Sequence, residues 1–480
     1  GDGPCVNVEE VGLPDKKRAR KDGDAVGVAL NGDSGRGSDG MDAPVKERFR
    51  CWMVKTDGEV RVDGVTEEDK RVDDWLVDAE KRIQETLDNA GEKFREIRRW
   101  EENFLAPECR QALRKKTVEV PRSVAFIRRR GTAPDKKVEE ALVEESKEDK
   151  APDGKLQGEL TVAMEGALVE GERRKALNLS GKLLLAPLTT LGNLPYRRIC
   201  KSMGADITCG EMALGLNILQ GQNSEWALMR RHEDEDIFGV QIAGNAPEIM
   251  TRAAEVVAKE CKVDFIDLNC GCPIDLLCNK GSGCALMDRL KKLKPMVEGI
   301  SSVVDCPVSV KMRIGKTENT PNAHAIISQL RSWGASWVTV HGRSKTQRYS
   351  RKADWEYISG PCLTAARDSG IPIVGNGDIY NWEDVVRRRE QENCPDAFMV
   401  ARGALIKPWI FREIKEQRHW DISSSERLDI YKDFAKKGLE HWGADNIGVE
   451  KTRKFFLEWL SFLYRYIPVG LLETVPITMN

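Results

Sequence analysis

The sequence predicts an α/β protein whose central part is a (β/α)8 TIM barrel, and three observations predict it. Eight short β-rich runs follow one another between residues 182 and 405, and most gaps between them can hold a crossover helix. The runs are continuously apolar rather than alternating, which is typical of parallel strands buried on both faces. Eight such repeats match a closed barrel. A doubly wound sheet is the competing fold, but no Gly-x-Gly-x-x-Gly follows the first run.

Each run is expected to be one barrel strand. In chain order they are Lys182–Thr189, Asp206–Met212, Phe238–Gly244, Phe265–Gly271, Val308–Ile314, Trp337–Arg343, Ile371–Asp378 and Ala397–Leu405. Amphipathic spacing predicts crossover helices at Pro247–Lys262 and Asn322–Gly334. We therefore expect residues 181–415 to form a catalytic barrel domain.

Beyond the last run the pattern becomes helical, and residues 416–480 are expected to form a small all-α domain. Apolar residues recur at helical spacing, and the serines before Glu426 can cap the first helix. The stripe comprises Leu428, Ile430, Phe434, Leu439, Phe455, Phe456, Trp459, Leu460 and Leu463.

The N-terminal part is expected to be a charged extension that is largely disordered or helical. Residues 1–42 are rich in Gly and Asp and cannot bury enough apolar area to fold, so we expect a disordered tail. Its basic patch, Lys16–Lys21, is either a nuclear-import or RNA-contacting segment or a solvated charge run. Residues 43–170 are expected to be a charged helical and linker extension, with helices before residue 115 and a linker around Arg128–Arg130.

Composition excludes several classes of protein. The 13 cysteines show no disulfide framework, so we expect reduced thiols in an intracellular protein, cytoplasmic, nuclear or both. No apolar run reaches the length of a membrane span and no signal peptide is recognisable, so no membrane contact is expected. The first 170 residues contain no histidine, which excludes a Cys3His zinc finger there, and no metal site is expected.

The last two strand ends are the most informative, because barrel active sites lie at the carboxyl ends of the strands. Strand seven ends in Gly375-Asn376-Gly377-Asp378, and strand eight ends in Ala401-Arg402-Gly403. Glycines let backbone N–H groups approach a phosphate, and Arg402 adds charge. Tight βα turns would explain each glycine singly. The two motifs together predict a phosphate-bearing ligand.

Lys311 and His341 are expected at the ends of strands five and six. A lysine buried there is costly unless it meets an anion or an electron-rich ring. A contact with a cofactor is therefore the favoured interpretation for both. A salt bridge within the barrel is the alternative for Lys311, and a satisfied core histidine is the alternative for His341.

Cys272 follows strand four within Asn269-Cys270-Gly271-Cys272-Pro273, a rigid turn toward the barrel mouth. It can be a proton donor, a nucleophile, a metal ligand or an inert core thiol. Zinc is disfavoured, because no second Cys-x-x-Cys pair and no nearby histidine are present. Cys270 should point the other way and pack in the core. The Gly281–Cys284 loop that follows is a candidate lid.

These residues resemble the tRNA-dihydrouridine synthases, and most of all their eukaryotic tRNA-dihydrouridine(47) synthase branch. The resemblance covers roughly Gly181 to Gly470, with the motifs in order. They are the Ala186-Pro187-Leu188 opening, Asp267 to Pro273, Cys284 to Met287, Val310-Lys311, Val340 to Arg343, Gly375 to Asp378 and Ala401 to Gly403.

The resemblance implies an FMN-bound barrel and a helical tRNA-binding domain. It implies that NADPH or NADH reduces the FMN, and that the C5–C6 double bond of a uridine in tRNA is then reduced to dihydrouridine. Hydride would pass from flavin N5 to C6, and Cys272 would give the proton to C5. No membrane partner is implied, messenger RNA is a further candidate substrate, and we expect a monomer.

Residue by residue, the resemblance also implies a cofactor site. Asn269 would lie near the flavin or the substrate base. FMN would be bound by Pro187, Leu188, Thr189, Gln241, Lys311, His341, Asn376, Gly377, Asp378, Ala401 and Arg402. The basic loop after strand six would contact RNA phosphates through Arg343, Lys345, Arg348 and Arg351, unless it is only a solvated charged loop.

Two departures from the family stand out. The zinc fingers usual in this branch are missing, and the tail Glu473–Asn480 diverges, which suggests a truncated or alternatively spliced helical domain. Two other functions stay open. One is an FMN barrel oxidoreductase acting on a free small-molecule pyrimidine, and the other is a noncatalytic RNA-binding relative. The sequence does not indicate which uridine is chosen.

Overall fold

The computed structural model describes residues 100–131, 177–349 and 351–471. These described residues all belong to one compact unit. The expectations for Lys16–Lys21, for helices around Trp75 to Leu87 and for the tail after Leu471 lie outside the described residues.

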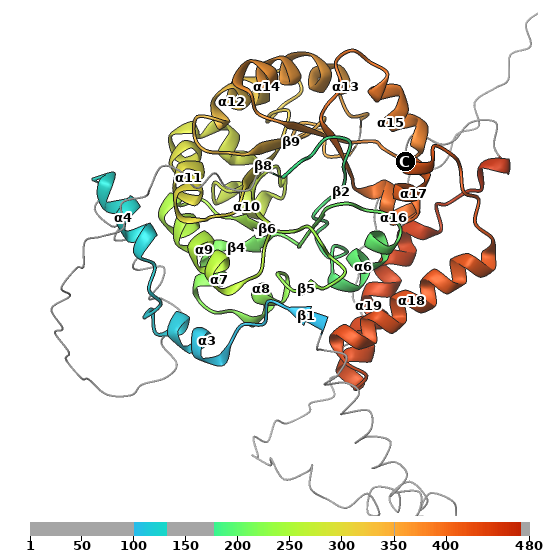
Figure 1. Ribbon diagram of the computed structural model, residues 1–480, viewed down its shortest axis with the longest axis horizontal. Coiled ribbons are helices and arrows are strands. Elements are labelled where there is room, and N and C mark those ends of the chain that lie inside the picture. Colours follow the sequence, from blue (N-terminus) through green and yellow to red (C-terminus); the bar gives the residue numbers. More distant parts are fainter. Residues whose placement is uncertain (1–99, 132–176, 350, 472–480) are drawn as a thin grey trace, which may run out of the picture. The chain divides into compact units, whose positions relative to one another are not determined.

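The predicted barrel is confirmed (Figure 1). Its strands run parallel in the order β2-β11-β10-β9-β8-β7-β6-β3, and a bridge between Leu184 and Ile207 closes the ring. All eight predicted runs contain a strand, each shorter than predicted because the run includes residues that leave the sheet to form the following loop. The strands are β2 (Leu183–Leu185), β3 (Thr208–Cys209), β6 (Phe238–Ala243), β7 (Phe265–Cys270), β8 (Val308–Arg313), β9 (Trp337–His341), β10 (Ile373–Asn376) and β11 (Ala397–Val400).

Helices surround the strands and include both predicted crossover helices. The longer ones are α6 (Leu194–Ser202), α9 (Pro247–Glu260), α11 (Leu290–Val303), α12 (Ala323–Leu330), α14 (Leu363–Ser369), α15 (Trp382–Arg389) and α17 (Ile410–Glu416). Short elements fill the loops: β4 (Ala213–Leu214), α7 (Gly215–Leu219), α8 (Asn223–Ala227), β5 (Arg231–His232), α10 (Asp275–Asn279), η2 (Gly283–Asp288), α13 (Trp355–Tyr357), η3 (Ile358–Cys362), α16 (Arg402–Ile406) and η4 (Val469–Leu471).

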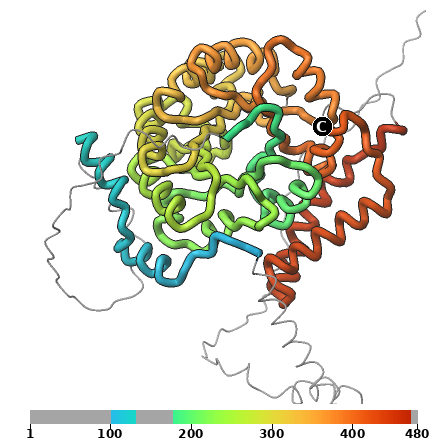
Figure 2. Tube along the Cα trace, in the orientation of Figure 1, coloured from blue at the N-terminus to red at the C-terminus, as the bar shows by residue number. Residues whose placement is uncertain are grey.

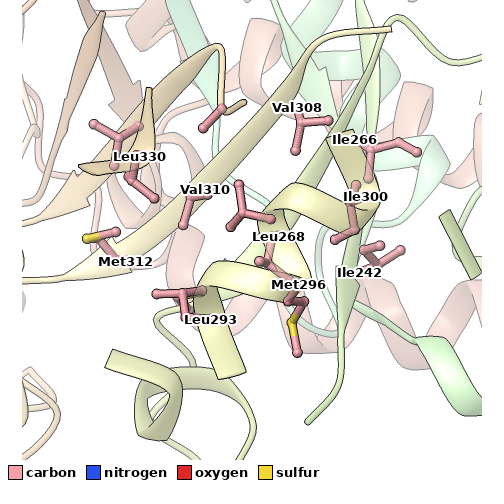
Figure 3. Packing of buried hydrophobic residues seen from close by; sticks show 14 of the residues in the cluster. Ile242, Ile266, Leu268, Leu293, Met296, Ile300, Val308, Val310, Met312 and Leu330 are labelled. Atoms are coloured by element: carbon pink, nitrogen blue, oxygen red, sulfur yellow. The ribbon is translucent and has the colours of Figure 1, made fainter. Parts of the chain in front are cut away.

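The main core lies between the strands and this helical layer. Figure 3 shows Leu268 and Val310 of neighbouring strands facing Met296 of α11, and all three side chains are fully buried. Burying one such side chain contributes about 1.5–3 kcal/mol. The continuous apolar runs of the sequence exist because the outward-facing residues of each strand meet helices.

Inside the barrel, side chains alternate along the strands, and this alternation positions the site. The first inward layer is apolar: Phe265 and Trp337 open β7 and β9, and their rings meet edge-on at 5.0 Å. Successive inward residues on β7 are Asp267 and Asn269, which are polar although still buried. The apolar layer fills the amino end of the barrel, so polar side chains gather toward the carboxyl end.

The helical C-terminal region is confirmed as α18 (Ser424–Trp442) and α19 (Asn446–Leu463). The predicted cap is present, because the Ser423 hydroxyl accepts from the Glu426 amide in a reciprocal capping box. Trp459 of α19 packs on Tyr196 of α6, with ring centroids 5.4 Å apart. The Trp459 indole also donates to the Leu405 carbonyl at 3.0 Å. The helical region is thus docked on the helix that follows β11.

A segment before the barrel corrects the expected linker. Residues 116–170 were predicted to be a charged linker, but residues 121–129 form α4, which packs on α9 and α11. Before it, β1 (Glu101–Glu102) pairs with β5, and α3 (Pro107–Arg114) follows. Figure 2 traces this segment in blue along the barrel flank. The prediction missed α4 because only two of its residues, Ser123 and Ile127, are buried, and only one of these is apolar.

Removing one partner of a buried ion pair should strongly destabilise the protein. Arg197 donates to Glu235 at 2.8 Å, and both side chains are at most 1 % exposed. We expect Glu235→Gln to lower the free energy of unfolding by about 3–5 kcal/mol, because it leaves a buried guanidinium without its countercharge. Denaturant unfolding measures this. Glu450→Gln breaks an exposed pair with Arg453 and should change stability by less than about 0.5 kcal/mol; equal effects would contradict the prediction.

Candidate active site

A cavity of about 850 Å³ opens at the carboxyl end of the barrel. This size falls in the range of small-molecule sites. Every residue assigned above to the cofactor lines it, and so do Cys272, Arg343 and Arg348. Lys345 and Arg351 do not line it. The eight strand ends therefore bring together residues that are up to 215 positions apart in the chain, from Pro187 to Arg402.

A chain of hydrogen bonds fixes the backbone of Cys272. The Gln241 amide donates to Asp267 at 2.6 Å, and the Asn269 amide donates to Gln241 at 2.8 Å. The Asn269 side-chain oxygen then accepts from the Cys272 N–H at 3.0 Å. The Ser309 hydroxyl anchors the far end by donating to Asp267 at 2.5 Å. Asn269 thus acts inside the cavity wall as a positioning residue for the cysteine.

The expected lid is instead packed behind Cys272. Residues 281–284 are buried, and the Cys284 amide donates to the Cys272 carbonyl at 3.0 Å. A Cβ on Gly283 would lie 2.7 Å from that same carbonyl oxygen, and φ is 59° there, so only glycine fits. Cys270 is fully buried in the core, as its alternation predicts.

Cys272 itself is partly exposed to the cavity and protonated at neutral pH. Burial raises the pKa of its thiol above the ordinary value, although the Ile274 amide, Arg313 and Lys311 oppose that shift. A raised pKa disfavours the thiolate. A protonated thiol at this position is able to donate a proton and is not a preformed thiolate nucleophile.

Four cationic side chains surround His341. Burial lowers the pKa of Lys311 to about 8, with partial compensation from Asp267. Burial, followed by the charges of Arg313, Lys311, Arg343 and Arg402, lowers the pKa of His341 well below its usual value. His341 is therefore neutral at physiological pH. A cluster of cations around a neutral imidazole produces a positive potential in the cavity, which favours an anionic ligand.

The ends of β10 and β11 form the opposite wall. The Arg343 guanidinium binds both oxygens of Asp378, at 2.7 and 2.8 Å, and Arg402 reaches the same carboxylate at 3.3 Å. Gly377 has φ of 127°, and a Cβ there would lie 2.6 Å from Ala353. Gly375 instead faces the Trp355 ring. Gly377 and Gly403 line the cavity. Gly375 does not, and it allows the close packing of Trp355 instead.

The residues predicted to contact RNA divide into two groups. Arg343 was assigned to an RNA phosphate, but its side chain is 4 % exposed and paired with Asp378, so it belongs to the cavity wall. Arg348 is 61 % exposed at the mouth and shares Asp275 with Lys345. Arg351 is 67 % exposed and pairs with Glu318. Of these four residues, Lys345, Arg348 and Arg351 are the ones that offer charge to a ligand at or beyond the cavity mouth.

Several lining residues were not assigned from the sequence. Arg313, the next inward residue after Lys311 on β8, donates to the Gly271 carbonyl at 3.0 Å; the sequence places it at this strand end but gives it no role. Tyr349 is 49 % exposed and lies 4.3 Å from the Arg402 guanidinium. Phe462 and Arg465 reach the cavity from the helical region, and no local sequence signal places them there.

Within the described residues, no group of three or more His, Cys, Asp or Glu side chains is arranged to hold a metal ion. In the same part of the chain, no helix has the length and apolarity needed to cross a membrane.

Comparison with known proteins gives the family. The model of the dihydrouridine synthase family matches residues 184–452, more than half of the chain. A human protein named tRNA-dihydrouridine(47) synthase [NAD(P)(+)]-like is 58% identical over 307 residues, which are 64% of this chain and 46% of the human one.

Proteins with that same name from other organisms also match. The Xenopus tropicalis protein is 50% identical over 397 residues, 80% of this chain and 61% of its own. The Arabidopsis thaliana protein is 53% identical over 311 residues, 64% of this chain and 44% of its own. The chain thus spans about half the length of the curated relatives it matches. By the extent of the family match, and with Cys272 and the cation cluster facing one cavity, this chain belongs to the dihydrouridine synthase family.

Proposed function

We propose that this chain reduces the C5–C6 double bond of a uridine in tRNA to dihydrouridine, using bound FMN that NADPH or NADH reduces. One observation carries the proposal. A neutral cysteine thiol and a cluster of cations line the same cavity in a chain of this family. The names of the matched relatives support tRNA as substrate and NAD(P)H as reductant.

The cavity residues fit an anionic flavin nucleotide. Lys311, Arg313, Arg343 and Arg402 bring four cations to the cavity, and the carboxylates beside them are those of Asp267 and Asp378. A phosphate would balance that excess of positive charge. Gly377 and Arg402, at adjacent strand ends, would hold it. Lys311 and neutral His341 would meet the ring or its polar edge, and the bound flavin would supply the hydride.

The protein's own chemistry is then a proton transfer from Cys272. The Sγ–H donates its proton to C5 of the uracil while C6 receives the hydride, so the thiol becomes a thiolate. Arg313 and Lys311 stabilise that thiolate electrostatically. Because Cys272 is partly exposed, it can regain a proton from water. Asn269 keeps the sulfur in place throughout by fixing the Cys272 backbone.

The two alternative functions make different demands on the site. A free small-molecule pyrimidine would need no exposed cationic or aromatic groups at the cavity mouth, yet Arg348 and Tyr349 lie there and are exposed. A noncatalytic RNA-binding protein would need no network from Ser309 to the Cys272 amide. Both observations favour the RNA reductase.

The proposal is tested with the purified chain. We expect a yellow protein with the flavin absorbance at about 450 nm, and FMN as the nucleotide released on denaturation. We expect NADPH oxidation that depends on tRNA lacking dihydrouridine, and dihydrouridine in the product. A protein without flavin would refute the proposal. A yellow protein that reduces free pyrimidines but not tRNA would favour the small-molecule alternative.

Three further expectations belong to the same proposal. They are a monomeric state, a cytoplasmic or nuclear location, and activity on messenger RNA. Activity on messenger RNA is expected because any single-stranded uridine that can leave its stack could reach the same cavity.

A further inference from the structure

A strongly basic surface lies outside the cavity. It consists of the end of α4 and the start of α11, and we call it the α4–α11 basic face. Its seven cations are all exposed, and the nearby carboxylates in these two segments are Asp288 and Glu298, in a chain whose net charge is −2. The cations are Arg128, Arg129, Arg130, Arg289, Lys291, Lys292 and Lys294.

The α4 half of this face is firmly anchored. The Glu255 carboxylate of α9 accepts from the Arg122 amide at 3.0 Å, from the Ser123 amide at 2.7 Å and from the Ser123 hydroxyl at 2.5 Å. Arg122 also pairs with Asp305 at 2.8 Å, beyond the end of α11. Three hydrogen bonds to one buried carboxylate fix the start of the helix. Its last turn therefore presents arginines at a defined place.

The two halves of the face are contiguous. The Glu298 carboxylate lies 3.9 Å from Arg130 and 3.7 Å from Lys294, so one anion joins both helices. Within the described part of the chain, no carboxylate forms an ion pair with Arg128, Arg129, Arg289, Lys291 or Lys292. Figure 1 shows α4 beside α11 on one flank of the barrel, with α18 and α19 on the opposite flank.

The lysines of α11 stand where a helix disfavours them. Its first turn holds Lys291 and Lys292 and no acidic residue. The amino end of a helix carries a partial positive charge, so cations there are electrostatically unfavourable. An external anion removes that cost. The unbalanced charge on both helices is thus suited to a polyanionic partner.

The face reaches the end of the barrel at which the cavity opens. In a βα unit the helix begins near the carboxyl end of the preceding strand, and α11 follows the loop that carries Cys272. Arg289, just before α11, lies against this loop. Its guanidinium packs so closely on Gly281 that a Cβ built on that glycine would lie 2.0 Å from it. A long polyanion positioned over the cavity can therefore extend along α11.

We propose that the α4–α11 basic face binds the phosphate backbone of the tRNA substrate, at a distance from the uridine in the cavity. The proposal rests on the proposed function for the identity of the polyanion. Together with the helical region on the opposite flank, it gives the RNA a contact on each side of the cavity mouth. The residues that carry it lie partly in 121–131, before the region that the family model matches.

The test uses the full chain with Arg128, Arg129, Lys291 and Lys292 all changed to Gln, which leaves both Glu298 pairs intact. Binding of fluorescently labelled full-length tRNA is measured by anisotropy over a series of salt concentrations. Each lost phosphate contact lowers the slope of log affinity against log salt by about 0.7–0.9. We expect the slope to fall by roughly 2–4 and the affinity to drop at least about tenfold at 0.1 M salt.

A control variant removes three charges elsewhere: Arg331, Arg367 and Arg387, exposed arginines at the carboxyl ends of other barrel helices, are changed to Gln. It should bind tRNA as the parent chain does. An unchanged slope in the four-residue variant, with an intact thermal transition, would overturn the proposal. So would loss of binding to phosphatidylserine vesicles with tRNA affinity unchanged, which would make the face a membrane contact.

Binding and catalysis are scored separately. A short stem-loop that carries the target uridine should lose little affinity in the four-residue variant, because it is too short to reach the face. If the parent chain binds tRNA but does not reduce it, the proposed function fails while the salt-slope comparison still tests the face. An equal loss for stem-loop and full-length tRNA would contradict a distal contact.

Discussion

Replacing Cys272 by Ala should lower uridine reduction by about 100- to 10,000-fold while the protein stays yellow. This is the range that a positioned general acid contributes. The thiol is the polar group that the Asn269 network aims at the cavity, and its raised pKa keeps the proton available at neutral pH. Single-turnover reduction of tRNA by the pre-reduced protein measures the step directly, and flavin absorbance reports cofactor retention.

Cys394→Ala is the matched control, because Cys394 is another partly exposed free thiol that does not line the cavity. It should react at the parent rate. Full activity in Cys272→Ala would remove this residue from the acid role. Loss of flavin in that variant would instead indicate a structural defect. Cys272→Ser should recover part of the rate, since a hydroxyl is a weaker acid in the same position.

Replacing Lys311 by Met should weaken flavin binding by about 10- to 100-fold at pH 7, the value of a hydrogen bond to a charged group. In the parent chain the affinity should fall as the pH rises above about 8, because burial lowers the Lys311 pKa to about 8. Below that pKa the ammonium is charged and attracts an anionic or electron-rich partner. Above it the amine is neutral, and that attraction is lost.

Fluorescence titration of the flavin-free protein between pH 6 and 9.5 measures both effects. The Lys311→Met variant should show a flatter pH profile than the parent, since the titrating group has been removed. Lys432→Met, which removes an exposed lysine on α18, should retain the parental profile. An unaltered profile in Lys311→Met would assign the pH dependence to another group.

The hydrophobic pattern determined the barrel. Each strand is buried on both faces, so its sequence is a continuous apolar run, and the number and spacing of the runs suffice to predict the fold. The cavity residues were also predictable, because strand ends such as Asn376 to Asp378 and the turn at Cys272 carry polar groups that a barrel must gather at one end. Arg313 was also predictable at its strand end, although not its bond to the Gly271 carbonyl.

The tertiary structure alone decided how those polar groups pair. Arg343 belongs to a basic loop in the sequence, yet it is buried against Asp378. Phe462 and Arg465 reach the cavity because Trp459 docks α19 on the barrel. Helix α4 exists where a linker was expected, because a carboxylate on α9 caps it. Hydrophobic periodicity is a local property and fixes elements, whereas ion pairs and docked surfaces depend on residues distant in sequence, which only packing brings within reach.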